Sequence, residues 1–309
     1  MRRARLASLA TNNTLTISPG GLAAAVDGQR MLTDRDRHII SLLADHQVLT
    51  TDQIARLAFT NVITAQHRLS LLTGRAILAR FRRCQRPGTQ AWRYTLGING
   101  ALIHAASSGQ PLPRPATVTE KVLSLAESPK LSHLLGTNEF FVRLHQGLAD
   151  TGWSLAEWWP EKRVSSTLNG VARPDAYGEV ASDSGSVGFF LEYDNGTETI
   201  ARVVEKLDGY ADLAKADIVK PILFVVPGDV REHNLRDRLT RHTAGLPVAT
   251  ASLDRITERS PLEPVWRCAG VSRPLSLPEL ARLPAGRTAP ARRSADHQRP
   301  GSTYRREIA

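Results

Sequence analysis

Two acidic residues lie at the ends of two neighbouring predicted strands and limit how this chain can fold. Asp175 follows Pro174 in one strand-like run, and Glu192 comes 17 residues later, after the apolar run 188–191 (GFFL). An unpaired carboxylate in an apolar run is costly to bury, so Glu192 needs a metal ion, a lysine or hydrogen bonds beside it. Two such carboxylates supply the hard oxygen ligands of a Mg²⁺ site, which water and phosphate complete.

Each of these residues also has a purely structural interpretation. Pro-Asp pairs are common in turns, so Asp175 alone does not identify a site. Lys206 and Tyr210 are four residues apart on a predicted amphipathic helix, so they lie on one flank of that helix. The long Lys206 side chain can reach round toward the acids, or it can lie on the surface beside a half-buried tyrosine.

The order of predicted elements defines the fold class. Helical segments over 119–151 precede three strand-like runs, then an amphipathic helix over 197–215 and the buried strand 220–228. We therefore expect a mixed sheet flanked by helices, in the order α-β-β-β-α-β. Upstream, the chain predicts three helices followed by two strands, which is the order of a winged helix-turn-helix.

Positive charge is concentrated in the first third of the chain. Residues 1–100 contain 14 arginines, five aspartates and neither lysine nor glutamate, an excess of nine positive charges. Such an excess in one small domain favours a phosphate-backbone partner. The alternative is a protein-interaction module whose arginines form a solvated face.

The third predicted helix is the one that should enter a major groove. Its outward residues are Asn61, Thr64, His67 and Arg68. The following hairpin carries arginines suited to phosphate or minor-groove contacts, which position a protein on DNA without reading its sequence. These are Arg80, Arg82, Arg83, Arg86 and Arg93. Apolar residues Val62, Leu69 and Leu72 should face the core.

The acidic pair and the element order resemble the PD-(D/E)XK nuclease superfamily. That resemblance implies a lysine two residues after the glutamate, but this chain has Asp194 there. Either Asp194 is a further metal ligand and Lys206 supplies the cation, or the site is degenerate. The Lys206–Tyr210 spacing is similar to a Gln-x-x-x-Tyr element of RecB-like nucleases, which also suggest His133 as an upstream ligand.

Several segments together narrow the resemblance. They are Leu32–Leu57 (LTDRDRHIISLLADHQVLTTDQIARL), the helix LSHLLGTNEFFVRL, the RPDAY segment and FFLEYDNGTETIARVVEKLDGY. In this order the segments are similar to the actinobacterial replication-relaxation family, over roughly residues 30–255. The family is associated with plasmids and integrated mobile elements. The resemblance therefore implies a role in DNA metabolism more than a particular reaction.

Two functional hypotheses stay open. The first is a DNA-binding protein of plasmid or mobile-element replication or relaxation that nicks DNA with Mg²⁺, using Asp175 and Glu192 as metal ligands and Asp194 and Lys206 as further catalytic residues. The second is a non-catalytic DNA-binding accessory or transcriptional regulator whose degenerate nuclease fold recruits a relaxase or a replication initiator. A tyrosine relaxase fits poorly, since the nine histidines form no metal-binding array.

The predicted organisation is a sequence of five segments. They are a disordered leader (1–30), a winged-helix domain (31–108), a linker (109–118), a nuclease-like domain (119–258) and a Pro/Arg-rich, largely disordered tail (259–309). Two distant cysteines and the lack of a long apolar run favour a cytoplasmic protein. The expected partner is double-stranded DNA, and a homodimer is a further candidate because winged helices often act as dimers.

Overall fold

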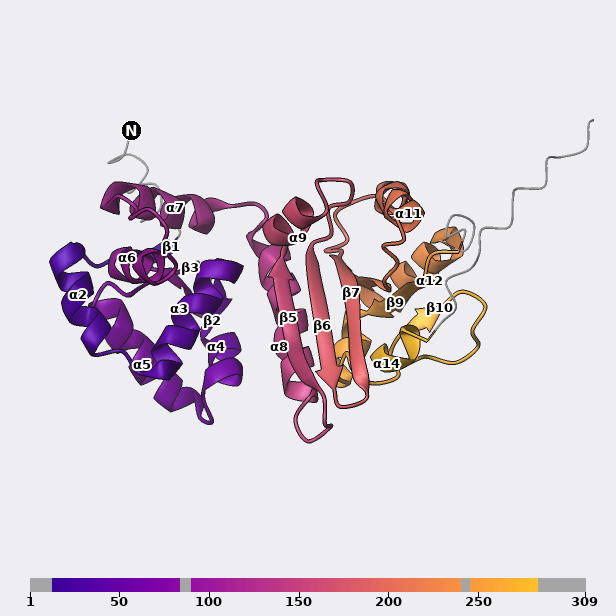
Figure 1. Cartoon of the computed structure of the whole chain (residues 1–309), viewed down its shortest axis with the longest axis horizontal. Helices are drawn as coiled ribbons and strands as arrows, with labels where there is room; N and C mark the ends of the chain where they lie inside the picture. The colour runs from indigo at the N-terminus through magenta and orange to yellow at the C-terminus, as the bar shows by residue number, and fades with distance from the viewer. Residues whose placement is uncertain (1–12, 84–89, 240–244, 283–309) are drawn as a thin grey trace, which may run out of the picture.

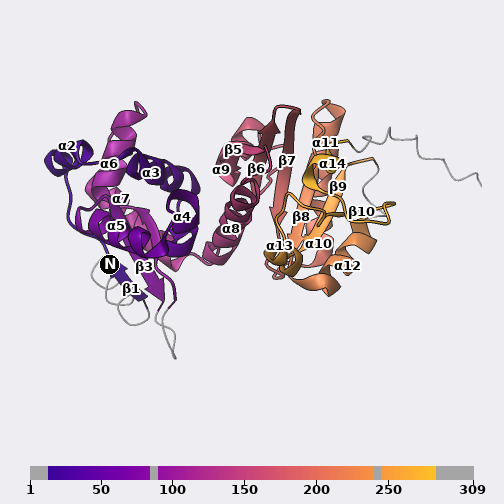
Figure 2. The ribbon, with the colours of Figure 1, turned by 90° about the horizontal axis from the view of Figure 1, so that it is seen from below.

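A computed structural model describes residues 13–83, 90–239 and 245–282 of the chain (Figure 1). It is a mixed α/β structure with two sheets, and the two parts of the chain lie side by side (Figures 1 and 2). Within the described residues, no helix is both long enough and apolar enough to cross a membrane.

The first part contains the three helices and the two strands that the sequence predicts. Its elements are β1 (Asn13–Thr16), α2 (Leu22–Arg30), α3 (Asp34–His46), β2 (Leu49–Thr50), α4 (Thr51–Ala58), α5 (Val62–Gly74), β3 (Leu78–Arg83), β4 (Arg93–Leu96) and α6 (Ile98–Ser107). The strands form a small antiparallel sheet in the order β1-β3-β4-β2.

Side-chain caps fix where the three predicted helices begin. Thr33 and Thr50 each form a capping box, with Asp36 and Gln53 respectively, and Asn61 accepts from the second and third backbone N–H groups of α5. Val62 does not face the core as predicted: it is 46% exposed, because it lies in the first turn, beyond the reach of the packed face.

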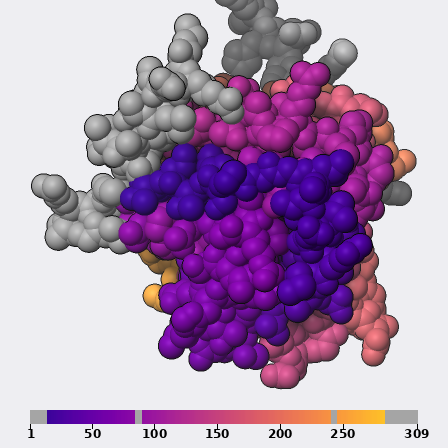
Figure 3. All heavy atoms as spheres, turned by 90° about the vertical axis from the view of Figure 1, so that its left-hand side faces the viewer, coloured from indigo at the N-terminus to yellow at the C-terminus, as the bar shows by residue number. Residues whose placement is uncertain are grey.

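The predicted disordered leader is wrong for residues 13–30. β1 pairs with β3, and α2 packs against α6 with Ala25 in the core. Figure 3 shows this end of the molecule, with the indigo segment lying across the purple elements. Residues 13–16 are ordered because β3 is otherwise an edge strand, whose backbone N–H and C=O groups are available to pair with β1. Residues 1–12 lie outside the described part of the chain.

The predicted linker ends at Arg114, because α7 (Pro115–Glu127) follows it and packs against α6, β3 and β4 of the first part (Figure 1). The second part begins after this helix. Its elements are α8 (Leu131–Gly147), β5 (Ser154–Pro160), α9 (Glu161–Thr167), β6 (Ala176–Ser182), β7 (Gly185–Tyr193), α10 (Ile200–Glu205), α11 (Leu207–Lys215), β8 (Ile222–Val226), α12 (Gly228–Leu239), β9 (Val248–Ser252), α13 (Leu253–Glu258), β10 (Arg267–Cys268) and α14 (Leu277–Leu280). Proline at the first helical position of α7 is favourable, because its missing N–H has no partner there in any case.

These strands form one six-stranded mixed sheet in the order β10-β9-β8-β7-β6-β5. β5, β6 and β7 run antiparallel, whereas β7, β8 and β9 run parallel. Helices α8, α13 and α14 cover one face, and α9 to α12 cover the other. β7 therefore lies between two strands and two helical layers, which explains its almost uninterrupted apolar sequence.

Two predicted elements are each divided in the structure. The predicted strand 154–164 ends at Pro160, whose fixed φ starts α9 instead. The predicted helix 197–215 begins only after Thr199, which caps α10, and it divides into α10 and α11 at Lys206.

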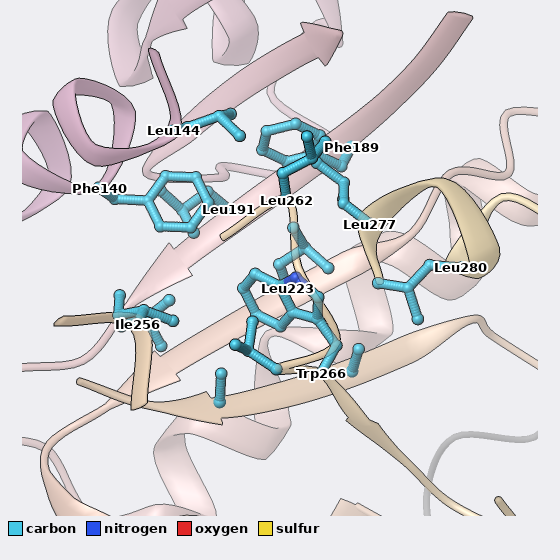
Figure 4. Close-up of a cluster of buried hydrophobic side chains, with 14 of the residues drawn as sticks. Phe140, Leu144, Phe189, Leu191, Leu223, Ile256, Leu262, Trp266, Leu277 and Leu280 are labelled. Carbon is cyan, nitrogen blue, oxygen red and sulfur yellow. The ribbon is translucent and has the colours of Figure 1, made fainter. Parts of the chain in front are cut away.

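The predicted disordered tail is wrong for residues 259–282. Trp266 is fully buried and its indole Nε1 donates to the backbone oxygen of Pro261 (2.8 Å). Leu262, Leu277 and Leu280 lie with it against the sheet and α8 (Figure 4). Widely spaced apolar residues among prolines thus complete a core, a pattern that composition alone does not distinguish from disorder. Residues 283–309 lie outside the described part.

Helix α8 joins the two parts. One side of α8 packs Phe140 and Phe141 on the sheet, and the other side contacts α4 (Figure 2). Asn138 donates to the backbone oxygens of His46 (3.2 Å) and Val48 (2.8 Å), which end α3 and precede β2. These buried hydrogen bonds fix the position of the first part relative to the candidate site.

Candidate functional site

Glu192 lies at the end of β7 and is buried, with only 2% of its surface exposed. Alternation along β7 places it on the same face as Phe190, toward α10 and α11. There the Lys206 ammonium lies 2.7 Å from its Oε2, and the Tyr210 hydroxyl donates to its Oε1 at 2.6 Å. The positive charge and the hydrogen bonds that this buried carboxylate needs therefore come from α10 and α11, the two helices that follow β7 in the chain.

The spacing of Lys206 and Tyr210 explains how both reach one carboxylate. They are four residues apart at the junction of α10 and α11, so their side chains lie on one flank. Gly209 allows the close approach of α11, because a Cβ there would lie 2.5 Å from the backbone oxygen of Val171. Lys206 also lies 4.0 Å from Glu198, a second, weaker partner.

Burial and charge set the protonation of this group. Burial and, to a smaller extent, the Asp175 charge raise the pKa of Glu192, whereas Lys206 and Tyr210 lower it, and the net result is a pKa of about 7. Burial would lower the pKa of Lys206, but Glu192 and Asp175 outweigh it and raise that pKa. Lys206 is therefore a permanent cation beside two acids whose charges repel each other.

Asp175 precedes β6 and is held by three contacts. Its N–H donates to the backbone oxygen of Leu191 (3.0 Å), and its Oδ2 accepts from the N–H of Tyr193 (2.8 Å). Its Oδ1 lies 2.9 Å from Nε2 of His133, on α8. Gly136 lets α8 come this close, because a Cβ there would lie 2.4 Å from the Tyr193 ring.

The contact with Asp175 also sets the charge of His133. Burial lowers the pKa of His133, but the hydrogen bond to Asp175 and the charge of Asp175 raise it, and the net shift is upward. His133 thus donates to the aspartate, and its protonation neutralises part of the negative charge near Glu192.

Asp194 does not join the other two carboxylates in one cluster. Its Oδ2 lies 2.6 Å from Nε of Arg231 on α12, and its Oδ1 accepts from the N–H of Gly196 (2.6 Å). No local spacing in the sequence signals the ion pair of Asp194 with Arg231, because 37 residues separate the two. Lys206 contacts Glu192, as the first alternative for the missing motif lysine expects, but Asp194, which that alternative makes a further metal ligand, is engaged by Arg231 and Gly196.

The predicted residues meet at a cavity of about 410 Å³. Its lining includes His133, Asp175, Glu192, Asp194 and Lys206. Within the described residues, no cluster of three or more His, Cys, Asp or Glu side chains is arranged to hold a metal ion. The donor chemistry still fits Mg²⁺, which usually takes only one or two protein carboxylates and completes its shell with water and phosphate.

The predicted DNA-contacting residues of α5 have different surroundings. Asn61, Thr64 and His67 are exposed near the beginning of the helix. Arg68 instead faces α3, where its Nε lies 2.9 Å from Oδ1 of Asp36 and its Nη2 contacts Oδ2. Arg68 therefore holds α3 to α5, and its guanidinium is not directed at an outside partner.

The hairpin arginines surround one aromatic ring. The guanidinium groups of Arg80 and Arg82 each lie 4.2 Å from the ring centre of Trp92. Arg83 is exposed, and Arg93 donates to Oε1 of Gln90 (2.6 Å). Arg86 lies outside the described residues, as does the predicted hairpin turn.

The buried pair of Asp36 and Arg68 leads to a testable prediction. Burial raises the pKa of Asp36, but Arg68 and Thr33 outweigh it and hold that pKa below its ordinary value of 3.8. Such a depressed pKa contributes stability at higher pH, and the contribution is lost as the pH falls below 3.8. Arg68→Gln should lower the free energy of unfolding by about 2 kcal/mol at neutral pH.

Urea denaturation at a series of pH values measures this effect. The difference between the variant and the wild type should shrink below pH 3.8, where Asp36 becomes protonated. Arg75→Gln, on an exposed residue just after α5, is the control and should change stability by less than about 0.5 kcal/mol. Equal stability of Arg68→Gln and wild type at neutral pH would contradict the structural role.

Comparison with known proteins identifies the family. A family model described as replication-relaxation matches residues 40–226, which include the second half of α3, all of α4 and α5, and Asp175, Glu192 and Lys206. No curated protein and no solved structure gives a significant match. The matched segment covers more than half of the chain, and it includes both the arginine-bearing strands β3 and β4 of the first part and the two acids of the candidate site. The chain therefore belongs to the replication-relaxation family.

Proposed function

We propose that this protein binds DNA and nicks or cleaves it, with Mg²⁺, during the replication or relaxation of a plasmid or mobile element. Family membership indicates the replication or relaxation role. Metal-dependent cleavage is supported by the contact of Lys206 with buried Glu192, which lies beside Asp175 in one cavity. Two acids and one lysine are the groups that metal-dependent hydrolysis of a phosphodiester requires.

Each group has a separate task in this scheme. Asp175 and Glu192 would hold the ion, which, when bound, lowers the pKa of a coordinated water and offsets the charge of the phosphate. Lys206 stabilises the negative charge that develops on the phosphate as water adds to phosphorus and the leaving oxygen departs. Tyr210 and His133 orient the two carboxylates through the hydrogen bonds described above.

The element order supports a PD-(D/E)XK-like fold for the second part. Leaving aside the short α9, the order is α8, then β5, β6 and β7, then α10 and α11, then β8. The two acids lie at adjacent ends of β6 and β7, as the resemblance implies. Lys206 occupies the place of the motif lysine from a helix instead of from the strand, and the ion pair with Arg231 makes Asp194 an anchor for α12.

The first part supports DNA binding as a winged helix. Helices α3, α4 and α5 precede the hairpin of β3 and β4, and the first turns of α5 present polar residues to solvent. Asn61, Thr64 and His67 would face base edges, while Arg80, Arg82, Arg83 and Arg93 would contact phosphates. Because Arg68 is paired with Asp36, we exclude it from the proposed contact surface.

A second function is favoured by the fact that the carboxylate oxygens of Glu192 and Asp175 all have protein partners. Both oxygens of Glu192 accept a donor, and both oxygens of Asp175 have protein partners, so the network is complete without an ion. On this hypothesis the protein is a DNA-binding accessory or regulator. Its second part would then recruit a relaxase or a replication initiator.

Incubation of purified protein with supercoiled plasmid separates the two functions. With Mg²⁺ or Mn²⁺, the nuclease hypothesis expects conversion to open circles that EDTA abolishes. Gel-shift measurements on the same samples follow DNA binding. Binding without any conversion, unchanged by metal, would overturn the nuclease hypothesis and support the accessory role.

A further inference from the structure

A second cavity lies beside the candidate site and is not used by the chemistry proposed above. It measures about 550 Å³ and shares Lys130, His133, Glu161, Arg173 and Asp175 with the smaller cavity. The two hollows therefore meet at Asp175, where a scissile phosphate would lie. A volume of about 300–1,000 Å³ is typical of pockets that enclose a small molecule.

Three basic side chains of this larger cavity have no partner among the residues that the structure describes. Lys130, Lys162 and Arg173 are exposed, and none of their side chains forms an ion pair or hydrogen bond with any residue that the structure describes. Two other cations beside the candidate site are neutralised: Arg231 pairs with Asp194 and Lys206 with Glu192. Three unpaired cations at the edge of one cavity suit an anionic ligand that spans several phosphates.

The apolar part of the cavity lining suits a nucleobase. Leu125, Leu134 and Trp158 supply apolar walls. Both faces of Trp158 are already covered, by His46 at 3.6 Å and by Phe141 at 4.9 Å between ring centres, so its edge forms a rigid wall. Such a wall can contact a flat base without having to rearrange.

Two polar groups in the cavity lack partners. The Ser165 hydroxyl oxygen is buried and has no hydrogen bond, and the Gln47 side-chain amide makes none with the described residues. Gln47 is also held at a φ of 66°, a conformation that residues other than glycine seldom adopt. An amide carries both donors and an acceptor, as recognition of a base edge requires.

We propose that this cavity binds an unpaired nucleotide of single-stranded DNA next to the candidate cleavage site. Taking DNA as the ligand rests on the proposed function. A paired base could not enter a pocket of this size, so the strand must be single or locally opened, as in enzymes that extrude a nucleotide into a pocket. Lys130, Lys162 and Arg173 would contact the phosphates on either side of that nucleotide.

Fluorescence anisotropy in EDTA tests the binding without any metal-dependent cutting. The probe is a fluorescein-labelled oligothymidylate of about ten nucleotides, within the length that single-strand sites usually cover. The variant Lys162→Gln/Arg173→Gln should bind it about tenfold more weakly. Its slope of log K against log salt should be shallower by about 1.4, since each phosphate contact on a single strand contributes about 0.7.

Two further variants sharpen the result. Gln47→Ala should bind about fivefold more weakly with an unchanged salt slope, because it removes a neutral hydrogen-bonding group. Lys121→Gln is the matched control: Lys121 is exposed on α7 and lines neither cavity, so binding should change less than about twofold. Equal binding and equal salt slopes of the double variant and the wild type would overturn the proposal.

Competition with unlabelled DNA tests whether the strand must be unpaired. A duplex should displace the probe much less well than a single strand does, and equal displacement would also overturn the proposal. These results are independent of cutting. If the wild type leaves plasmid intact but the double variant binds the probe more weakly, the nuclease hypothesis fails and the nucleotide pocket stands. If the wild type cuts plasmid and both proteins bind the probe equally, the nuclease hypothesis stands and the nucleotide pocket fails.

Discussion

Glu192→Gln should abolish plasmid nicking, with a loss of about 10²–10³-fold or more, while DNA binding by the first part stays within about twofold. The substitution keeps the shape of the side chain but removes the charge that a metal ion and Lys206 both require. Lys206 would then lie beside a neutral amide at the end of β7. The measurement is the rate of conversion of supercoiled plasmid to open circles with Mg²⁺, together with gel shifts on uncut DNA.

Asp194→Asn is the informative comparison for this result. Asp194 is engaged by Arg231 and by the N–H of Gly196, so its change should reduce nicking only modestly. Thermal unfolding of both variants shows whether either is misfolded. Full nicking activity in folded Glu192→Gln would exclude Glu192 as a metal ligand. A complete loss of nicking in Asp194→Asn alone would mean that Asp194, which stands where the nuclease motif has a lysine, carries the catalytic charge instead.

Trp266→Ala should lower the free energy of unfolding of the protein by about 3–5 kcal/mol, the usual cost of truncating a large buried aromatic side chain. Trp266 is fully buried, contacts Phe140 edge-on at 6.1 Å between ring centres, and makes a hydrogen bond to Pro261. Truncation removes all three contributions and leaves a cavity under the sheet (Figure 4).

Urea denaturation followed by circular dichroism measures the loss. Val230→Ala provides the control, because Val230 is 78% exposed on α12 and should change stability by less than about 0.5 kcal/mol. A change in Trp266→Ala below about 1 kcal/mol would mean that the segment 259–282 contributes little to the core. It would then match the disordered tail that the composition predicts.

The agreement between sequence and structure is greatest where a signal is local. Thr33, Thr50 and Asn61 cap the helices that follow them, because capping needs only backbone groups two or three residues away. The apolar run of β7 likewise predicts a buried strand, and one acid within it predicts a partner. These signals identified the main helices and strands and the acidic pair without knowledge of the fold.

The failures have a common cause in long-range packing. Residues 13–16 form a strand only because β3 offers an open edge, and residues 259–282 are ordered because their scattered apolar side chains complete a core made by α8 and the sheet. Neither partner is visible in the local sequence. Composition therefore predicted disorder where tertiary contacts supply the free energy of ordering.

The amino-acid sequence is enough to show that Glu192 needs a partner, since an unpaired acid at the end of an apolar strand is costly to bury, and that Lys206 and Tyr210 share one helical flank. Which groups meet depends on the packing of the helices on the sheet. The tertiary structure brought α11 over β7, joined His133 to Asp175, and paired Asp194 with Arg231 and Arg68 with Asp36. The physical reason is that an ion pair depends on distance in space, and the packing of helices on a sheet brings together residues that lie far apart along the chain.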